Sequence, residues 1–390
     1  MRERQYYKEE LRKHREHFHK YPELALKEIK TSEYIRKHLE EWGYQIQSVP
    51  PTGLIAEHPV LRKNEKILVL RAEMDALPIQ EQTGLPFASV HEGCMHACGH
   101  DGILATALTL AKLLSEEADT FPINVRFLFE PAEEIGEGAQ RMLDAGAMDA
   151  PVPDAFLMFH YAADMPLGMA VHQGQTSAMI GSIQIEVHGK SSHWSEAHKG
   201  IDSIYTASKV IQYIHELNET YERKAPCLVG IGTVHGGEYP NIIADYVKLN
   251  GNIRACREED FYGLYEQLES AFAAIEKETG TIIEMKLTKD PVLAFANDEA
   301  LTKTAVKVGK ELFGERFILE GEDEVFLAGD NAYRYFLRTK GLFVIFLAAL
   351  PGKSYPLHHP KYVLDEEILP YSLEALYKII FETASDGKEK

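Results

Sequence analysis

The amino-acid sequence predicts an α/β fold, in which a doubly wound mixed sheet forms a larger domain and a smaller, ferredoxin-like α+β domain is inserted into it. A short, wholly apolar run at 67–70 and similar, mainly apolar runs at 125–129 and 155–159 are typical of strands buried on both faces, and a helical pattern at 101–114 separates the first two. From about residue 177 the patterns follow the order β-α-β-β-α-β, which is that of a split β-α-β unit. The change of pattern predicts the second domain.

The larger domain is predicted to be discontinuous along the chain. After the β-α-β-β-α-β region, a helical pattern at 300–313, an apolar strand at 341–347 and a closing helix at 366–381 resume the first pattern. The length of 390 residues also exceeds what one hydrophobic core usually serves. We therefore expect residues 1–176 and 291–390 to form one domain and residues 177–290 to form the insert.

Charge and composition limit the partners that the chain can have. The formal net charge is -19 and no Lys/Arg cluster stands free of acids, which argues against nucleic acid and favours a small-molecule substrate. No stretch approaches the ~18 apolar residues of a membrane span, and the N-terminus lacks the apolar core of a signal peptide. Only four cysteines occur, too few for a disulfide framework. We expect a cytoplasmic protein.

A short motif at residues 95–101, Met-His-Ala-Cys-Gly-His-Asp, carries the first sign of chemistry. Cys98 and His100 are two residues apart, so in an extended segment both side chains leave on the same side. A thiolate and a neutral imidazole suit Zn²⁺ or a similar ion. Alone the pair is a weak signal, because a buried Cys beside a hydrogen-bonded His gives the same pattern.

Further possible ligands follow other predicted strands. Glu133 and Glu134 come after the strand at 125–129, His160 follows the strand at 155–159, and His358-His359 lies in a Pro-flanked segment. A surface turn, a core histidine and a rigid polar loop are the alternative interpretations. The carboxyl ends of parallel strands meet at one edge of a sheet, so the side chains are expected to converge there.

Together these residues predict a site for two metal ions. Two ions can activate a water and polarise a carbonyl, while a further carboxylate, Glu133, takes the proton of the water and returns it to a leaving amine. The chemistry implied is amide hydrolysis. The five predicted ligands are Cys98, His100, Glu134, His160 and one of His358 and His359.

The sequence resembles the M20 peptidase family. Specifically, it resembles the amidohydrolase branch, which includes aminoacylase-like, hippurate, indole-acetyl-amino-acid and N-acetyldiaminopimelate hydrolases. The resemblance covers nearly the whole chain in order. Its motifs are Tyr-Pro-Glu-Leu at 21–24, Arg-Ala-Glu-Met-Asp-Ala-Leu-Pro-Ile at 71–79, the motif at 95–101, Glu-Pro-Ala-Glu-Glu at 130–134 and Leu-His-His-Pro-Lys-Tyr at 357–362.

The resemblance implies the roles of individual residues. Glu133 matches the general base, Asp75 lies in the acid-rich turn that supports the site, and the Leu-His-x-Pro pattern selects His358 over His359. It also implies two divalent ions per chain, Mn²⁺, Zn²⁺, Co²⁺ or Ni²⁺. The residues matching metal ligands are Cys98, His100, Glu134, His160 and His358.

The inserted domain resembles the lid and dimerisation domain of the family. His193 then matches a donor to the oxyanion, Asn241 a substrate contact, and Arg254 a fork for a substrate carboxylate. A surface histidine and an ordinary strand-end arginine are the alternatives. In the resembling family the inserted domains pair and this histidine reaches the active site of the partner, so a homodimer is expected.

Some segments depart from the family pattern and leave the substrate open. The family's small residues after the lid histidine are replaced by Trp194-Ser195-Glu196, its usual His by Ile103, and its Ser-Glu-Asp-Phe stretch by residues 329–332. The main hypothesis is hydrolysis of N-acyl amino acids, of the deacetylase or aminoacylase type. A dipeptidase or carbamoyl-amide hydrolase on the same site is the alternative within enzymes. A catalytically silent metal-binding scaffold is another, although it would not need Glu133.

Overall fold

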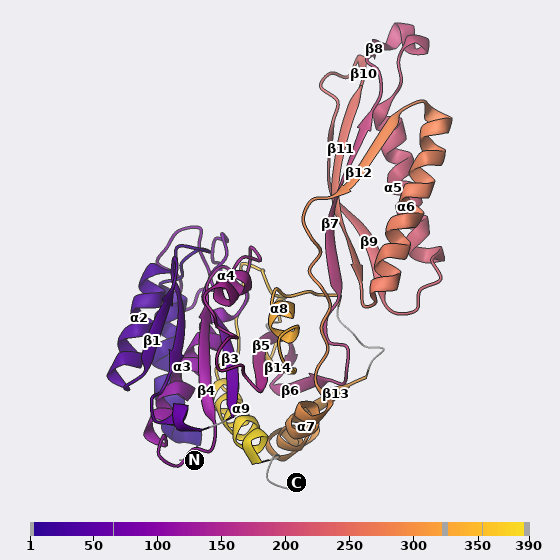
Figure 1. The fold of residues 1–390 in the computed structure, drawn as a ribbon. Coiled ribbons are helices and arrows are strands. Elements are labelled where there is room, and N and C mark those ends of the chain that lie inside the picture. The colour runs from indigo at the N-terminus through magenta and orange to yellow at the C-terminus, as the bar shows by residue number, and fades with distance from the viewer. Residues whose placement is uncertain (1–3, 65, 322–326, 353, 386–390) are drawn as a thin grey trace. The chain divides into compact units, whose positions relative to one another are not determined.

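A computed structural model describes residues 4–64, 66–321, 327–352 and 354–385, and the chain divides into two compact units (Figure 1). The first unit consists of Met1–Gly174, Ala296–Gly321 and Asn331–Lys390, and the second of Gln175–Phe295 and Glu322–Asp330. Each unit has its own cluster of buried apolar side chains.

A mixed eight-stranded sheet runs through the first unit. Strands β4, β3, β5 and β14 at its centre are parallel, whereas β2 pairs antiparallel with β4 and β6 antiparallel with β14. Every residue of β3 and β4 is buried, as the apolar runs predicted. The mixed α/β class is therefore confirmed. In spatial order the strands are β1 (Gln45–Val49), β2 (Gly53–Glu57), β4 (Asn124–Glu130), β3 (Ile67–Glu73), β5 (Ala155–Pro166), β14 (Gly341–Ala349), β6 (Gly168–His172) and β13 (Phe317–Glu320).

The helices of this unit pack around the long helix α3 and the sheet. Helix α3 contacts β3 and β5 as well as α1, α2 and α9, and its first two residues are the last two of the motif at 95–101. The helices are α1 (Lys8–Lys20), α2 (Ile29–Glu41), α3 (His100–Glu116), α4 (Gly138–Asp144), α7 (Glu299–Phe313), α8 (Tyr333–Phe336) and α9 (Ile368–Ser385), with 3-10 turns η1 (Arg4–Tyr7), η2 (Leu61–Lys63) and η4 (Gly314–Arg316).

The second unit contains a four-stranded antiparallel sheet in the order β12-β7-β11-β9, with helices α5 and α6 packed against it (Figure 1). Alternate residues of β7 are buried, because one face of the sheet meets the helices. A two-stranded sheet of β8 and β10 lies beyond one end of β11. The elements are β7 (Met179–His188), β8 (Ser192–His193), η3 (Trp194–Lys199), α5 (Ser203–Thr220), β9 (Cys227–Gly236), β10 (Ile242–Ile243), β11 (Tyr246–Ala255), α6 (Glu258–Thr279) and β12 (Ile282–Leu287).

Residues 327–330, which the sequence analysis placed in the larger domain, group with the second unit. The carbonyl of Ala328 accepts a hydrogen bond from the N–H of Ala178 at 2.8 Å, and the carbonyl of Leu327 accepts one from Nη1 of Arg254 at 2.7 Å. The returning chain is thus bonded to the start of β7 and the end of β11. No described helix combines the length and the apolar character needed to cross a membrane.

Candidate metal centre

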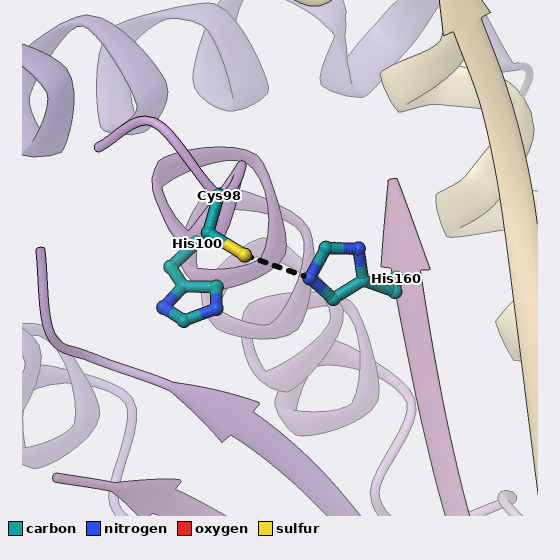
Figure 2. Close-up of side chains that lie close together, drawn as sticks. All are labelled: Cys98, His100 and His160. Carbon is teal, nitrogen blue, oxygen red and sulfur yellow. Dashed lines mark hydrogen bonds between the residues drawn. The ribbon is translucent and has the colours of Figure 1, made fainter. Parts of the chain in front are cut away.

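The sulfur of Cys98 lies between the side chains that the sequence singled out as metal ligands. It is 3.5 Å from Nε2 of His160 and 3.3 Å from Nε2 of His358. Figure 2 shows the sulfur directed at the His160 ring, with His100 on the neighbouring turn. Side-chain ligand atoms lie within 4.8 Å of one another in three overlapping groups: Cys98, His100 and His160; Cys98, Glu134 and His358; and His100, Glu133 and Glu134.

Two histidines are oriented by backbone carbonyls. Nδ1 of His100 is 2.9 Å from the carbonyl oxygen of Asp75, and Nδ1 of His160 is 2.9 Å from that of Tyr161. A carbonyl oxygen can only accept, so Nδ1 of each ring carries the hydrogen. In the neutral rings each Nε2 then carries the lone pair that can bind a metal ion, which is the arrangement that orients metal-bound histidines in proteins.

The two adjacent acids are held by one carboxylate, that of Asp75. The backbone N–H of Glu133 donates to Oδ1 of Asp75 at 3.1 Å, and the N–H of Glu134 donates to Oδ2 at 3.0 Å. Asp75 follows β3 and is fully buried, and this burial raises its pKa to about 6. Because each carboxylate oxygen receives one N–H, the turn at 133–134 is fixed relative to the end of β3.

The backbone at the centre adopts conformations that are rare for side-chain-bearing residues. Ala132, just before the two acids, has φ of 56°, and His358 has φ of 64°. Each such residue costs on the order of 1–3 kcal/mol and persists where the surroundings hold it. Here the N–H of Ala132 donates to Oε1 of buried Glu28 at 2.9 Å, and the N–H of His358 donates to the carbonyl of Ala97 at 2.9 Å.

Gly99 lets the motif turn into α3. Its φ of 84° is left-handed, and a Cβ at this position would lie 2.8 Å from the hydroxyl of Tyr362. Both the backbone and the space therefore require glycine between the thiol and the first residue of the helix.

The charges around Cys98 are those expected of a site built for cations. Burial, and then the carboxylates of Glu134 and Glu133, raise the pKa of the Cys98 thiol well above its ordinary value. Burial would also raise the pKa of Glu134, but its contacts with His358 and His100 lower it to about 2. Oε1 of Glu134 is buried and lies 3.4 Å from Nε2 of His358, its ion-pair partner in the described part of the chain. A set of imidazole, thiol and carboxylate donors fits a divalent transition-metal ion, which would favour the thiolate.

A buried network behind the centre was not predicted from the sequence. Nε of Arg15 is 3.0 Å from Oδ2 of Asp101, and Nδ1 of His19 is 2.9 Å from the same oxygen. These contacts tie α1 to the first turn of α3, next to His100. The only signal in the sequence is the i, i+4 spacing of Arg15 and His19, which places them on one face of a helix.

The second unit holds the remaining predicted residues, and it keeps two of them apart. His193 ends β8 and is exposed, and the N–H of the following Trp194 donates to the carbonyl of Asn241 at 3.2 Å. Arg254 lies near the other end of β11, where its Nε donates to Oδ1 of Asn252 at 2.8 Å. The β8-β10 sheet that contains His193 lies beyond the Tyr246 end of β11 (Figure 1), and eight steps of ~3.3 Å along the strand separate Tyr246 from Arg254 by roughly 26 Å.

Comparison with known proteins identifies the family. The model of the family described as peptidase family M20/M25/M40 matches residues 69–382. The chain belongs to this family. The resemblance that the motifs indicated is thus confirmed, and the chain is a metal-dependent amidohydrolase.

Several known proteins match over nearly the whole chain. The N-acetyl-L-cysteine deacetylase of Bacillus subtilis is 32% identical over 378 residues, covering 93% of this chain and 86% of the relative. Thermostable carboxypeptidase 1 of Saccharolobus solfataricus is 31% identical over 366 residues, covering 91% and 90%. A Bacillus subtilis structure described as a dinuclear metal-binding peptidase of the M20 family superposes with a TM-score of 0.81 at 29% identity, covering 98% of this chain and 99% of that one.

The role of Asp75 leads to a prediction for metal affinity. Asp75→Asn keeps the size of the side chain but presents an amide NH₂ to one of two backbone N–H groups, so one acid of the 133–134 turn loses its anchor. Supporting residues of this kind typically contribute 10–100-fold to metal affinity, and we expect a loss of about that size. Isothermal titration of the metal-free protein with Zn²⁺ measures it.

Asp154→Asn provides the matched control. Oδ2 of Asp154 accepts the N–H of Ile67 at 2.7 Å at the opposite end of β3, so it supports the same strand away from the centre. Its metal affinity should equal that of the wild type. Equal affinities for the Asp75 variant and the wild type would show that the turn does not depend on this carboxylate.

Proposed function

We propose that this M20 amidohydrolase cleaves the amide bond of N-acyl amino acids with a metal-activated water and Glu133 as general base. The observation that carries the proposal is that three imidazoles and the Glu133-Glu134 pair lie together with the thiol of Cys98 in overlapping ligand groups. The Bacillus subtilis relative named for N-acetyl-L-cysteine deacetylation supports the substrate class.

In this proposal Cys98, His100, Glu134, His160 and His358 hold two divalent ions, for which Mn²⁺, Zn²⁺, Co²⁺ and Ni²⁺ are the candidates. Cys98 belongs to two of the ligand groups, which supports a sulfur shared by both ions. Bound ions of this kind lower the pKa of a coordinated water and polarise a carbonyl oxygen.

Glu133 and Glu134 take different parts in this scheme. The side chain of Glu134 is within 3.4 Å of Nε2 of His358 and joins two ligand groups, whereas Glu133 joins only the group with His100 and Glu134. Glu133 accepts a proton from the attacking water and delivers it to the leaving amine. A general acid–base residue typically contributes ~10²–10⁴-fold to turnover.

Cleavage of dipeptides is the second candidate, which the Saccharolobus carboxypeptidase relative favours. Both substrates place an amino-acid carboxylate next to the scissile amide, so the same site can accept either. A screen of N-acetyl, N-aroyl, dipeptide and ureido substrates with each of the four metals separates the candidates, including the carbamoyl-amide hydrolase. If the protein turned over none of these substrates, the result would favour the silent metal-binding scaffold. The cytoplasmic location of the protein stays a prediction from the sequence.

The two acids allow a paired test. Glu133→Gln removes the proton acceptor but keeps the size of the side chain, so we expect full metal content and turnover lower by about 10²–10⁴-fold. Glu134→Gln weakens a ligand, so its metal affinity should fall and its activity should partly return with added metal. Metal analysis and turnover of the two variants test this. If both variants lost metal to the same extent, the division of roles would be wrong.

We further propose that the enzyme is a homodimer paired through the second unit. Tyr246 and Arg254 are separated by roughly 26 Å along β11, and His193 lies beyond the Tyr246 end of that strand, so the distance from His193 to Arg254 exceeds the length of an N-acyl amino acid. If His193 donates to the oxyanion, with Asn241 beside it, and Arg254 binds the carboxylate, the two must come from different chains. The separation supports an active site completed by the partner.

Strand β9 offers an edge for this pairing. It is the last strand of the four-stranded sheet, and its residues from Thr233 to Gly236 are exposed. The side chain of Asn218 bonds both the N–H and the carbonyl of Val229, so the edge is covered at that point and open beyond it. Helix α5, which packs next to β9, exposes Ile204 and Tyr205 to more than half. An open edge with apolar neighbours suits a second copy of the chain.

Subunit exchange tests the shared site. We expect His193→Ala to lower turnover by roughly 10²–10³-fold, as for one oxyanion donor, with unchanged metal content. Mixing it with Glu133→Gln should restore activity, because the mixed dimer has one site with both defects and one with neither. Recovery toward half of the wild-type turnover in the mixed dimer is the expected result.

As the control, each variant is taken through the same subunit-exchange procedure alone, and its turnover should not recover. Proven exchange without recovery would place His193 in the site of its own chain or outside catalysis. A monomer that is fully active in solution would exclude the shared site.

A further inference from the structure

His193 is held by the residue two positions after it. Nδ1 of the imidazole accepts a hydrogen bond from the backbone N–H of Ser195 at 3.2 Å, and the hydroxyl Oγ of Ser195 lies 2.8 Å from the same nitrogen. His193 thereby caps the 3-10 turn η3 with its own ring.

These contacts determine which nitrogen of the neutral ring carries the hydrogen. A backbone N–H can only donate, so Nδ1 must accept, and the hydrogen of the neutral imidazole is on Nε2. With Nδ1 an acceptor, the Ser195 hydroxyl also donates to it. Within the described part of the chain Nε2 has no hydrogen-bond partner, so the ring presents an unoccupied N–H donor.

The backbone on either side limits how far the ring can move. His193 pairs with Ile242 in the β8-β10 sheet, and the N–H of Trp194 donates to the carbonyl of Asn241. The hydroxyl of Ser192 donates to the carbonyl of Glu196 at 3.0 Å, which closes the turn around Ser195.

We propose that Ser195 is a positioning residue that keeps His193 in the Nε2–H form, ready to donate to the carbonyl oxygen of the substrate. The proposal rests on the proposed role of His193 as oxyanion donor. With the hydrogen on Nδ1 instead, Nε2 would present a lone pair to the oxygen as negative charge develops there, and the interaction would be repulsive. A preorganised donor is what stabilises such an oxygen most.

The chain offers variants that separate this role from a merely structural one. Ser195→Ala removes the shorter of the two contacts to Nδ1 and leaves only the backbone N–H at 3.2 Å, so the preference for the Nε2–H form should weaken and an Nδ1–H population should appear beside it. Ser195→Thr keeps a hydroxyl and should restore the wild-type ring. Ser192→Ala removes a hydroxyl from the same loop that does not contact the imidazole, and should leave the ring unchanged.

The experiment is ¹⁵N NMR of the ¹⁵N-histidine-labelled, metal-loaded enzyme at about pH 8, above the ordinary histidine pKa of about 6.5. Resonances absent from His193→Ala identify the ring. We expect a pyridine-type Nδ1 and a pyrrole-type Nε2 in the wild type. A pyrrole-type Nδ1 in the wild type, or a tautomer unaffected by Ser195→Ala, would overturn the proposal.

Turnover gives the second readout. Loss of one hydrogen bond corresponds to about threefold to tenfold, so kcat of Ser195→Ala should fall by that factor with unchanged KM and metal content. In the His193→Ala background the same substitution should have no further effect. Equal slowing in both backgrounds would show a structural role and overturn the proposal. The two proposals can fail separately. If His193→Ala were fully active, His193 would not be the oxyanion donor. If the ring tautomer still responded to Ser195→Ala as expected, Ser195 would nevertheless be shown to position the ring.

Discussion

The contact on which the metal centre depends most is the one between the Asp75 carboxylate and the backbone of Glu133 and Glu134. Two N–H groups reach two oxygens of one buried side chain, while the carbonyl of the same residue orients His100. One residue just after β3 thus positions His100 on α3 and both acids after β4. Because β3 and β4 are parallel neighbours, their carboxyl ends bring these three groups to the same edge of the sheet.

Parallel strands explain why the convergence of these side chains could be predicted from the sequence. Runs such as Ile67–Leu70 and Phe127–Phe129 have no alternation, since both faces of the strand are covered, and the polar residues that follow must meet at one edge. Residue types and spacing then indicated the donors. Strands β1 and β13 carried no such signal, because β1 is mostly polar and exposed and no residue of β13 is fully buried. Their pairing to neighbours, rather than their composition, makes them strands.

The supporting contacts could not be predicted, because they join residues far apart in sequence. The bond from Arg15 to Asp101 spans 86 positions, and that from Ala132 to Glu28 spans 104. A buried Arg, His or Glu looks in sequence like any solvated residue on a helix. The grouping of residues 327–330 with the second unit likewise depends on backbone bonds to Ala178 and Arg254, which leave no trace in composition.

The position of Cys98 is the observation that bears most directly on the proposed centre of two ions, because its sulfur belongs to two ligand groups. X-ray absorption at the zinc edge of the reconstituted enzyme tests it. The account predicts a sulfur neighbour at about 2.3 Å and a second zinc at about 3.5–4 Å. A spectrum with only nitrogen and oxygen neighbours, or without a metal–metal distance in a fully loaded sample, would contradict a centre of two ions sharing Cys98.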